Sequence, residues 1–201
     1  KQLMIQIQEL IKHFVLGIVS LILVGNTMAE SAESFPKNFY NIVVKVQQEY
    51  DEDSFERKIN PALVTTVASI ESGYGDFPNA PTAKSANNYM GRHAIGNEPF
   101  VATASGAKLK KYESIEDNVR DFLKLMKSGN YYKEFRSAIE KDLPIEDQFK
   151  TLNNYSTNPQ YFDLLYNSYK KRISPISQTN KMFQGEKNLS DQMNKLNIPV
   201  M

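Results

Sequence analysis

Hydrophobic side chains recur at helical spacing along most of this 201-residue chain, and a single interval interrupts the pattern. After Pro36, spacings of three and four residues predict an amphipathic first helix, whose apolar stripe is Phe39, Ile42, Val43 and Val46. The interval 76–112 is instead rich in Pro, Gly, Ala and Asn. Within it, residues 100–102 and 107–109 flank a Ser105-Gly106 turn, which predicts a two-stranded ribbon. The pattern indicates an α+β fold that is mostly α, with a small β-hairpin insertion.

Capping residues predict where the other helices begin and end. Asn60-Pro61 starts a second helix, because Asn caps an N-terminus and Pro suits the first helical position. Gly73 ends that helix in a left-handed conformation. Ser114 starts another helix that ends at Ser128-Gly129, and its buried stripe is Val119, Phe122, Leu123 and Met126. Three more short helices are expected, over residues 131–140, over residues 144–152 and from Asn158-Pro159 onward.

Composition and charge exclude several functional classes. The chain has 24 basic and 23 acidic residues, so no global field attracts nucleic acid. The lack of cysteine excludes disulfides, thiolate metal sites, Fe–S clusters and a cysteine nucleophile. The two histidines, His13 and His93, are far apart in the sequence, and no glycine-rich phosphate loop is present. We therefore expect neither a metal nor a cofactor, and no nucleic-acid partner.

The first thirty residues have the features of an export signal. Lys1 and Lys12 are followed by an uncharged apolar run of 12 residues, 14–25. This length fits the ~7–15 residues of a signal-peptide core and is short of the ~20 that span a bilayer. Thr27-Met28-Ala29 supplies small side chains, so cleavage is expected after Ala29. A buried N-terminal helix and an uncleaved membrane anchor are the alternative interpretations.

The chain is therefore expected to have three parts. Residues 1–29 would form the signal peptide and residues 30–173 one domain. Beyond Ser174-Pro175 the composition turns to Asn, Gln, Ser and Lys without periodicity, which predicts a polar, flexible tail over residues 174–201. The domain would be exported to the periplasm or cell envelope as a monomer, without a membrane partner beyond the signal segment.

One carboxylate occupies a position on the second predicted helix where its pKa should be raised. Leu63, Val67 and Glu71 are spaced by four residues, so Glu71 shares the apolar stripe of the helix. It also lies in the last turn, where unpaired carbonyl groups disfavour an ionised carboxylate, and partial burial acts in the same direction. A carboxyl group with a raised pKa can act as a general acid near neutral pH. The alternative is a glutamate that caps or forms a salt bridge at a helix end.

Four segments resemble, in order, motifs of the glucosaminidase family, glycoside hydrolase family 73. Residues 70–75, Ile-Glu-Ser-Gly-Tyr-Gly, resemble its ESGWG signature, with Tyr in place of Trp. Residues 87–91 resemble its Asn-Leu-Phe-Gly element and residues 111–114 its Tyr/Phe-x-Ser element. Residues 154–161 are similar to its YATDPxY motif, with Ser for Ala and Asn for Asp. The resemblance covers roughly residues 59–172, and residues 98–101 and 106–109 resemble the Bax-type branch in particular.

This resemblance implies a lysozyme-like helical domain that cleaves β-1,4 bonds after N-acetylglucosamine in peptidoglycan. It assigns the catalytic acid to Glu71 and a supporting role to Tyr155. A glycosidase generally has a second carboxylate, ~5–5.5 Å from the first for retention or ~6.5–9.5 Å for inversion. Glu98 is the only acidic residue between Asp76 and Glu113, so it is the candidate, with Asp76 as its rival. An ordinary loop position for Glu98, and a route through the acetamido group of the substrate, are the alternatives.

Aromatic and amide side chains are expected to line the sugar cleft, because sugar faces stack on rings and sugar hydroxyls bind amides. The candidate substrate-binding residues are Tyr74, Phe77, Asn87, Asn88, Tyr89 and Gly91. Other tyrosines are assigned to helix packing, an assignment that could extend to Tyr89: Tyr131, Tyr132, Tyr161, Tyr166 and Tyr169. The lysine cluster at the second predicted strand, Lys108, Lys110 and Lys111, is assigned to a solvated edge, with a contact to anionic wall polymers as the alternative.

The leading hypothesis is thus an exported peptidoglycan hydrolase whose partners are the glycan strands of the cell wall. A lytic transglycosylase is a second hypothesis, because such an enzyme needs only one acid and forms an anhydro product. A third is a catalytically silent wall-binding module that has kept the fold. The irregular second carboxylate and the two motif departures, Tyr for Trp and Asn for Asp, motivate this last hypothesis.

Overall fold

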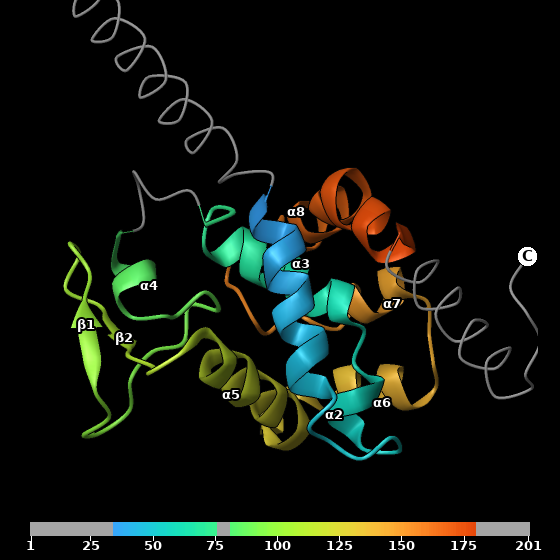
Figure 1. Ribbon diagram of the computed structural model, residues 1–201, viewed down its shortest axis with the longest axis horizontal. Helices are drawn as coiled ribbons and strands as arrows, with labels where there is room; N and C mark the ends of the chain where they lie inside the picture. The colour runs from blue at the N-terminus through green and yellow to red at the C-terminus, as the bar shows by residue number, and fades with distance from the viewer. Residues whose placement is uncertain (1–33, 76–80, 180–201) are drawn as a thin grey trace, which may run out of the picture. The chain divides into compact units, whose positions relative to one another are not determined.

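The structure, a computed structural model, describes residues 34–75 and 81–179. Most of these residues are helical, and Figure 1 shows one small sheet lying to one side of the helices. The predicted signal segment, Asp76, Phe77 and residues 180–201 lie outside the described residues. No helix within the described ranges is both long and apolar enough to cross a membrane.

The helix that carries Glu71 is the most buried one of the N-terminal half. It is α3 (Pro61–Glu71), and its residues from Ala62 to Ser69 are buried. Its N-cap is Asn60, whose side chain accepts a hydrogen bond from the backbone N–H of Ala62, and Pro61 is the first helical residue, as predicted. The helix ends at Glu71 with Ser72 as its C-cap, and Gly73 follows in the left-handed conformation expected of it.

Apart from α3, only the first described helix and α5 (Ile115–Ser128) are longer than eight residues in the described part of the chain. The first described helix spans residues 34–47, and α2 is a single turn (Phe55–Lys58). Ser114 caps α5 by accepting a hydrogen bond from the N–H of Asp117, and Gly129 ends it, as the sequence predicts. The others follow in chain order: α4 (Pro81–Ser85), α5 (Ile115–Ser128), a 3-10 turn (Asn130–Tyr132), α6 (Lys133–Glu140), α7 (Ile145–Lys150), α8 (Tyr161–Ser168) and a π-helical segment, η2 (Tyr169–Ile173).

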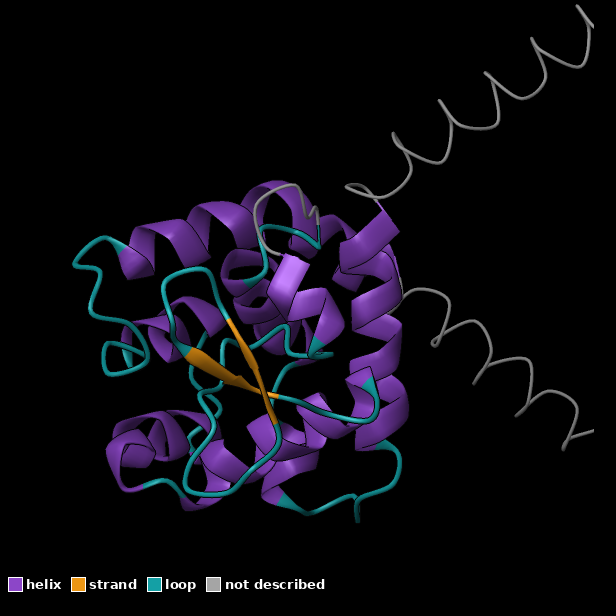
Figure 2. Ribbon diagram, turned by 90° about the vertical axis from the view of Figure 1, so that its left-hand side faces the viewer, coloured by secondary structure: helices purple, strands orange, loops and turns teal. Residues whose placement is uncertain are grey.

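The predicted ribbon is present as an antiparallel pair. Strand β1 (Phe100–Ala102) pairs with β2 (Lys108–Lys110), so the second strand begins one residue later than expected. The register places Val101 opposite Leu109. Figure 2 shows both strands in orange, and in Figure 1 the sheet lies next to α4, which contacts β1.

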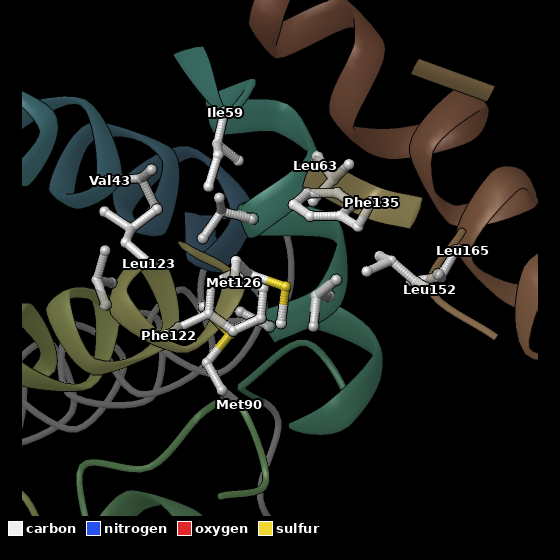
Figure 3. Packing of buried hydrophobic residues seen from close by; sticks show 14 of the residues in the cluster. Val43, Ile59, Leu63, Met90, Phe122, Leu123, Met126, Phe135, Leu152 and Leu165 are labelled. Atoms are coloured by element: carbon white, nitrogen blue, oxygen red, sulfur yellow. The ribbon is translucent and has the colours of Figure 1, made fainter. Parts of the chain in front are cut away.

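One hydrophobic core connects the helices. Figure 3 shows Val43 from the first described helix, Leu63 from α3 and Phe122 from α5 in one cluster with Met90 and Phe135. The predicted stripe of α5, from Val119 to Met126, lies in this core. Met90 comes from the loop that precedes the sheet, so the core fixes the residue that comes just before Gly91.

Helical structure continues beyond the expected end of the domain. Residues 174–179 are helical, whereas the sequence predicts that an irregular tail starts at Ser174. Ile173 and Ser177 are buried, and Ile176 packs against a small cluster that contains Ile173. Two buried positions, Ile173 and Ser177, and the partly buried Ile176 anchor this segment, although its composition lacks a regular apolar period.

Candidate active site

Glu71 is the last residue of α3, and its carboxyl group is half-buried. The hydroxyl of Tyr161, at the start of α8, donates a 2.8 Å hydrogen bond to its Oε1. Burial raises the pKa of Glu71, and the hydrogen bond from Tyr161 offsets only part of that rise. The direction agrees with the sequence analysis, because a raised pKa favours the protonated form that a general acid needs.

Gly91 lies against the other oxygen of this carboxyl group. Its φ is +67°, and a β-carbon at this position would be 3.1 Å from Oε2 of Glu71. Any other residue would therefore adopt an unfavourable backbone conformation and crowd Oε2. Glycine at position 91 lets the loop border the carboxyl group without covering it.

Two tyrosines complete the surroundings of Glu71. The rings of Tyr155 and Tyr161 stack with centroids 6.1 Å apart and an interplanar angle of 17°. The Tyr155 hydroxyl donates a 2.5 Å hydrogen bond to the carbonyl oxygen of Met90. Burial, and then the charge of Glu71, raise the pKa of both phenols, so both stay neutral and act as donors. Tyr155 thus holds the loop that carries Gly91, and Tyr161 holds the carboxyl group.

Tyr161 has a role that the sequence analysis missed. It is 5% exposed, so its assignment to packing is confirmed, but its hydroxyl also serves Glu71. The signal was present in the sequence, because Tyr155 and Tyr161 are the two tyrosines of one recognised motif. Only the fold shows that the second tyrosine reaches a residue 90 positions earlier.

Glu98 lies in the loop before β1. Its side chain is half-exposed, and both of its carboxylate oxygens have protein partners. Its Oε1 is 2.8 Å from Nζ of Lys110 on β2, and its Oε2 accepts a 2.9 Å hydrogen bond from the N–H of Ile95. The hydrogen bond from Lys110, then that from Ile95, lower the pKa of Glu98. This carboxylate is ionised at neutral pH, the state that a general base needs.

The charge network of the sheet extends to α5. Lys110 also lies 3.5 Å from Oδ1 of Asp121, whose Oδ2 accepts hydrogen bonds from Arg92 Nε and the Tyr112 hydroxyl. Burial acts to raise the pKa of Asp121, but these hydrogen bonds and the charges of Lys110 and Arg92 outweigh it and lower the pKa. The assignment of Lys110 to a solvated edge is wrong, since its side chain is 18% exposed and joins two carboxylates.

The side chains of Asn87 and Asn88, which were expected to bind sugar, form hydrogen bonds within the protein instead. The side chain of Asn88 is buried, donates to the carbonyl oxygens of Arg92 and Lys110 at 2.7 and 2.8 Å, and accepts from the N–H of Arg92 at 3.0 Å. Asn87 donates to the carbonyl oxygens of Tyr112 and Glu113. Both amides tie the loop 87–92 to the segment that contains β2, and neither N–H of Asn88 is left for a sugar hydroxyl.

The aromatic candidates lie in different surroundings. Tyr74 donates a 2.7 Å hydrogen bond to Ser168, and the guanidinium of Arg172 lies 4.2 Å from its ring centroid. Tyr89 is buried and stacks on Phe35 at 5.4 Å, so its ring belongs to the core.

A hollow of about 580 Å³ lies beside the two tyrosines of the site. It is formed by the segment between α7 and α8, and its lining includes Asn154, Tyr155, Ser156, Asn158, Tyr161 and Phe162. Rings and amide groups together are the surfaces that bind sugars. Among the described residues, no three His, Asp or Glu side chains converge as metal ligands would.

A comparison with models of protein families identifies the family of this chain. Residues 47–173, more than half of the sequence, match the model of the Glucosaminidase family, described as mannosyl-glycoprotein endo-beta-N-acetylglucosaminidase. The chain belongs to this family. The glucosaminidase is therefore a glycoside hydrolase, and the family that the sequence motifs predicted is confirmed. No match is found among curated protein sequences.

Solved structures share the fold of this glucosaminidase at low sequence identity. The catalytic domain of the autolysin Auto from Listeria monocytogenes is 18% identical with a TM-score of 0.56, over 73% of this chain and 86% of that one. A peptidoglycan hydrolase from Sphingomonas sp. A1 is 16% identical with a TM-score of 0.56, over 74% and 94%. The glycoside hydrolase domain of FlgJ from Salmonella typhimurium is 17% identical with a TM-score of 0.54, over 78% and 98%. The predicted lysozyme-like, mostly helical fold with a small sheet is confirmed.

Proposed function

We propose that this glucosaminidase cleaves the β-1,4 bond after N-acetylglucosamine in peptidoglycan glycan strands, with Glu71 as the general acid. The observation that carries the proposal is the state of Glu71, a half-buried carboxyl group with a raised pKa held by Tyr161. Solved structures of similar fold include an autolysin domain and a peptidoglycan hydrolase, which supports peptidoglycan as the substrate class.

The two oxygens of Glu71 have different surroundings, which suggests how the proton is delivered. Oε1 accepts the hydrogen bond from Tyr161, so the acidic proton is available on Oε2, the oxygen bordered by Gly91. During cleavage the proton passes from Oε2 to the leaving glycosidic oxygen as the bond to the anomeric carbon breaks. The neutral hydroxyl of Tyr161 then stabilises the carboxylate that remains, since a hydrogen bond to a charged acceptor is stronger than one to a neutral acceptor.

Glu98 is the proposed second carboxylate, acting as the base that activates water. Its lowered pKa supports this role, because the group is ionised when Glu71 is protonated. Its ion pair with Lys110 fixes its orientation, and each carboxylate oxygen retains a lone pair for water.

Analysis of the muropeptides from digested sacculi tests the proposal. Wild-type protein should release fragments with reducing-end N-acetylglucosamine, and Glu71→Gln should abolish the release. Glu140→Gln is the matched control, because Glu140 is exposed at the end of α6 and forms no ion pair among the described residues. Sacculus binding without any cleavage by the wild type, unchanged in Glu71→Gln, would contradict the proposal and indicate a wall-binding module.

A lytic transglycosylase is the second candidate function. The observation that favours it is that both oxygens of Glu98 already have protein partners, which leaves Glu71 as the one acid without a charged partner in the site. Mass spectrometry of the same digest separates the candidates, since a transglycosylase product is lighter by one water. Export to the cell envelope and a monomeric state remain predictions from the sequence.

A further inference from the structure

A second hollow, also of about 580 Å³, runs along α5, and we call it the α5 groove. None of its lining residues belongs to the hollow beside Tyr155 and Tyr161. Most of its lining side chains are charged: Tyr50, Glu56, Lys110, Tyr112, Asp117, Arg120, Asp121, Lys124, Lys127 and Ser128. The two tyrosines add apolar surface, so the groove has the mixed character of a site for a charged, partly apolar ligand.

The charges that line the α5 groove are paired, with one exception. Its cations have partners at 2.8–2.9 Å, namely Lys127 with Glu56, Arg120 with Asp117 and Glu49, and Lys110 with Glu98. Lys124 is exposed, and its ammonium group has no hydrogen bond or ion pair within the described part of the chain. The groove therefore holds one ammonium group that is available to an anion.

Asp121 connects this groove to the active site. It accepts the 3.0 Å hydrogen bond from Nε of Arg92, the residue that follows Gly91 beside Glu71. The side chain of Arg92 is 25% exposed, and its two terminal amino groups form no hydrogen bond among the described residues. Asp121 and Lys124 are three residues apart on α5, so their side chains lie ~5–6 Å apart at Cβ. Arg92, in the loop beside Glu71, and Lys124, in the groove, thus each have donor groups without a partner among the described residues, and Asp121 lies between them on α5.

We propose that the α5 groove binds the peptide stem of the sugar next to the cleaved bond, with Lys124 pairing a stem carboxylate. The inference rests on the proposed function. Stem peptides branch from the glycan and carry amide oxygens and free carboxylates, so a stem near the cleaved bond leaves the sugar cleft close to Glu71. Arg92 offers its amino groups to the first acyl oxygens of the stem, and Lys124 offers its charge further along α5.

Two substrates test the site, intact glycan strands with stems and the same strands from which an amidase has removed the stems. The measured quantity is the ratio of kcat/KM on the stem-bearing strands to kcat/KM on the stem-free strands. For Lys124→Glu we expect this ratio to fall about fivefold, the size of one well-formed surface ion pair. For Lys124→Gln, which removes the charge without reversing it, the fall should be smaller.

Lys133→Glu is the matched control. Lys133 is exposed at the start of α6, forms no ion pair among the described residues and lines neither hollow, so the ratio should not change. An unchanged ratio in Lys124→Glu, or an equal loss on both substrates, would overturn the stem site while leaving the proposed function intact. Absence of Glu71-dependent cleavage of both substrates by the wild type would instead overturn the proposed function.

Discussion

The hydroxyl of Tyr161 holds the proposed acid, and its removal should change the pH dependence of the enzyme. The hydrogen bond from Tyr161 lowers the pKa of Glu71 against the effect of burial, so Tyr161→Phe should raise that pKa further. Because an acid works only while protonated, the alkaline limb of the kcat/KM profile should move to higher pH, and kcat should fall about tenfold.

Tyr166→Phe is the control for this experiment. Tyr166 also lies on α8 and is half-buried, but its hydroxyl has no hydrogen bond among the described residues. An alkaline limb that stays in place or moves to lower pH in Tyr161→Phe would contradict the role assigned to this hydroxyl.

Gly91 and Gly96 form a natural pair for separating backbone strain from crowding of the acid. Both have a positive φ, +67° and +60°, so Gly→Ala at either site should cost about 1 kcal/mol of folding free energy. Only at Gly91 would the new methyl group lie 3.1 Å from Oε2 of Glu71, whereas at Gly96 nothing lies within 4 Å. We expect similar losses of Tm and a loss of kcat, at least about tenfold, in Gly91→Ala alone. Equal activities of the two variants would show that Oε2 is not the reacting oxygen.

The raised pKa of Glu71 also predicts a cost in stability. A carboxyl group whose pKa is raised by folding binds its proton more tightly in the folded state, so stability falls as pH rises from the unfolded-state pKa through the folded-state value. Glu71→Gln removes this titration. The Tm of the variant should exceed that of the wild type above neutral pH and match it near pH ~3, where Glu71 is protonated in both states. Thermal unfolding at the two pH values tests this, and a difference of the same size at both would contradict it.

At the scale of the secondary-structure elements, the sheet places Lys110 beside Glu98. The hydrogen bond from Lys110 is the main cause of the lowered pKa of Glu98, so Lys110→Met should raise that pKa. If Glu98 is the base, it works only while ionised, and the acidic limb of the kcat/KM profile should move to higher pH. Lys108→Met is the control on the same strand, because Lys108 lies over the ring of Phe100 and pairs with no carboxylate among the described residues. An unmoved acidic limb in Lys110→Met would exclude Glu98 as the base.

The elements that the sequence predicts well are those with strong end signals. Asn60-Pro61 and Ser114 mark the starts of α3 and α5, and the turn at Gly106 marks the ribbon. The helices α2 and α4 have four and five residues, too few for an apolar period to show. Helix α8 starts at Tyr161 rather than directly after Asn158-Pro159, because the side chain of Asn158 accepts from the N–H of Gln160 and forms a turn of its own.

At the scale of the whole molecule, the site combines segments that are distant in the sequence. The position of Glu71 on an apolar stripe is a local property, so the sequence predicts both its partial burial and the direction of its pKa shift. The partners of Glu71, Gly91 and Tyr161, come from a loop and from the start of another helix. Asn88 donates a hydrogen bond to the carbonyl oxygen of Lys110, and the ring of Tyr89 stacks on Phe35. No local sequence pattern relates these partners, so the sequence could not predict that both side chains serve the protein rather than a sugar.

Met90 and Gly91 are consecutive residues, one filling the core and the other bordering the reacting oxygen of the proposed acid. Their peptide unit also offers the carbonyl group that Tyr155 binds. A substitution that shifts Met90 by a few tenths of an ångström would therefore also shift Gly91, which is covalently bonded to Met90 and borders the acid. Substitutions around Met90 would therefore reduce catalysis before they prevent folding. In evolution, this part of the core should accumulate substitutions more slowly than an equally buried region elsewhere.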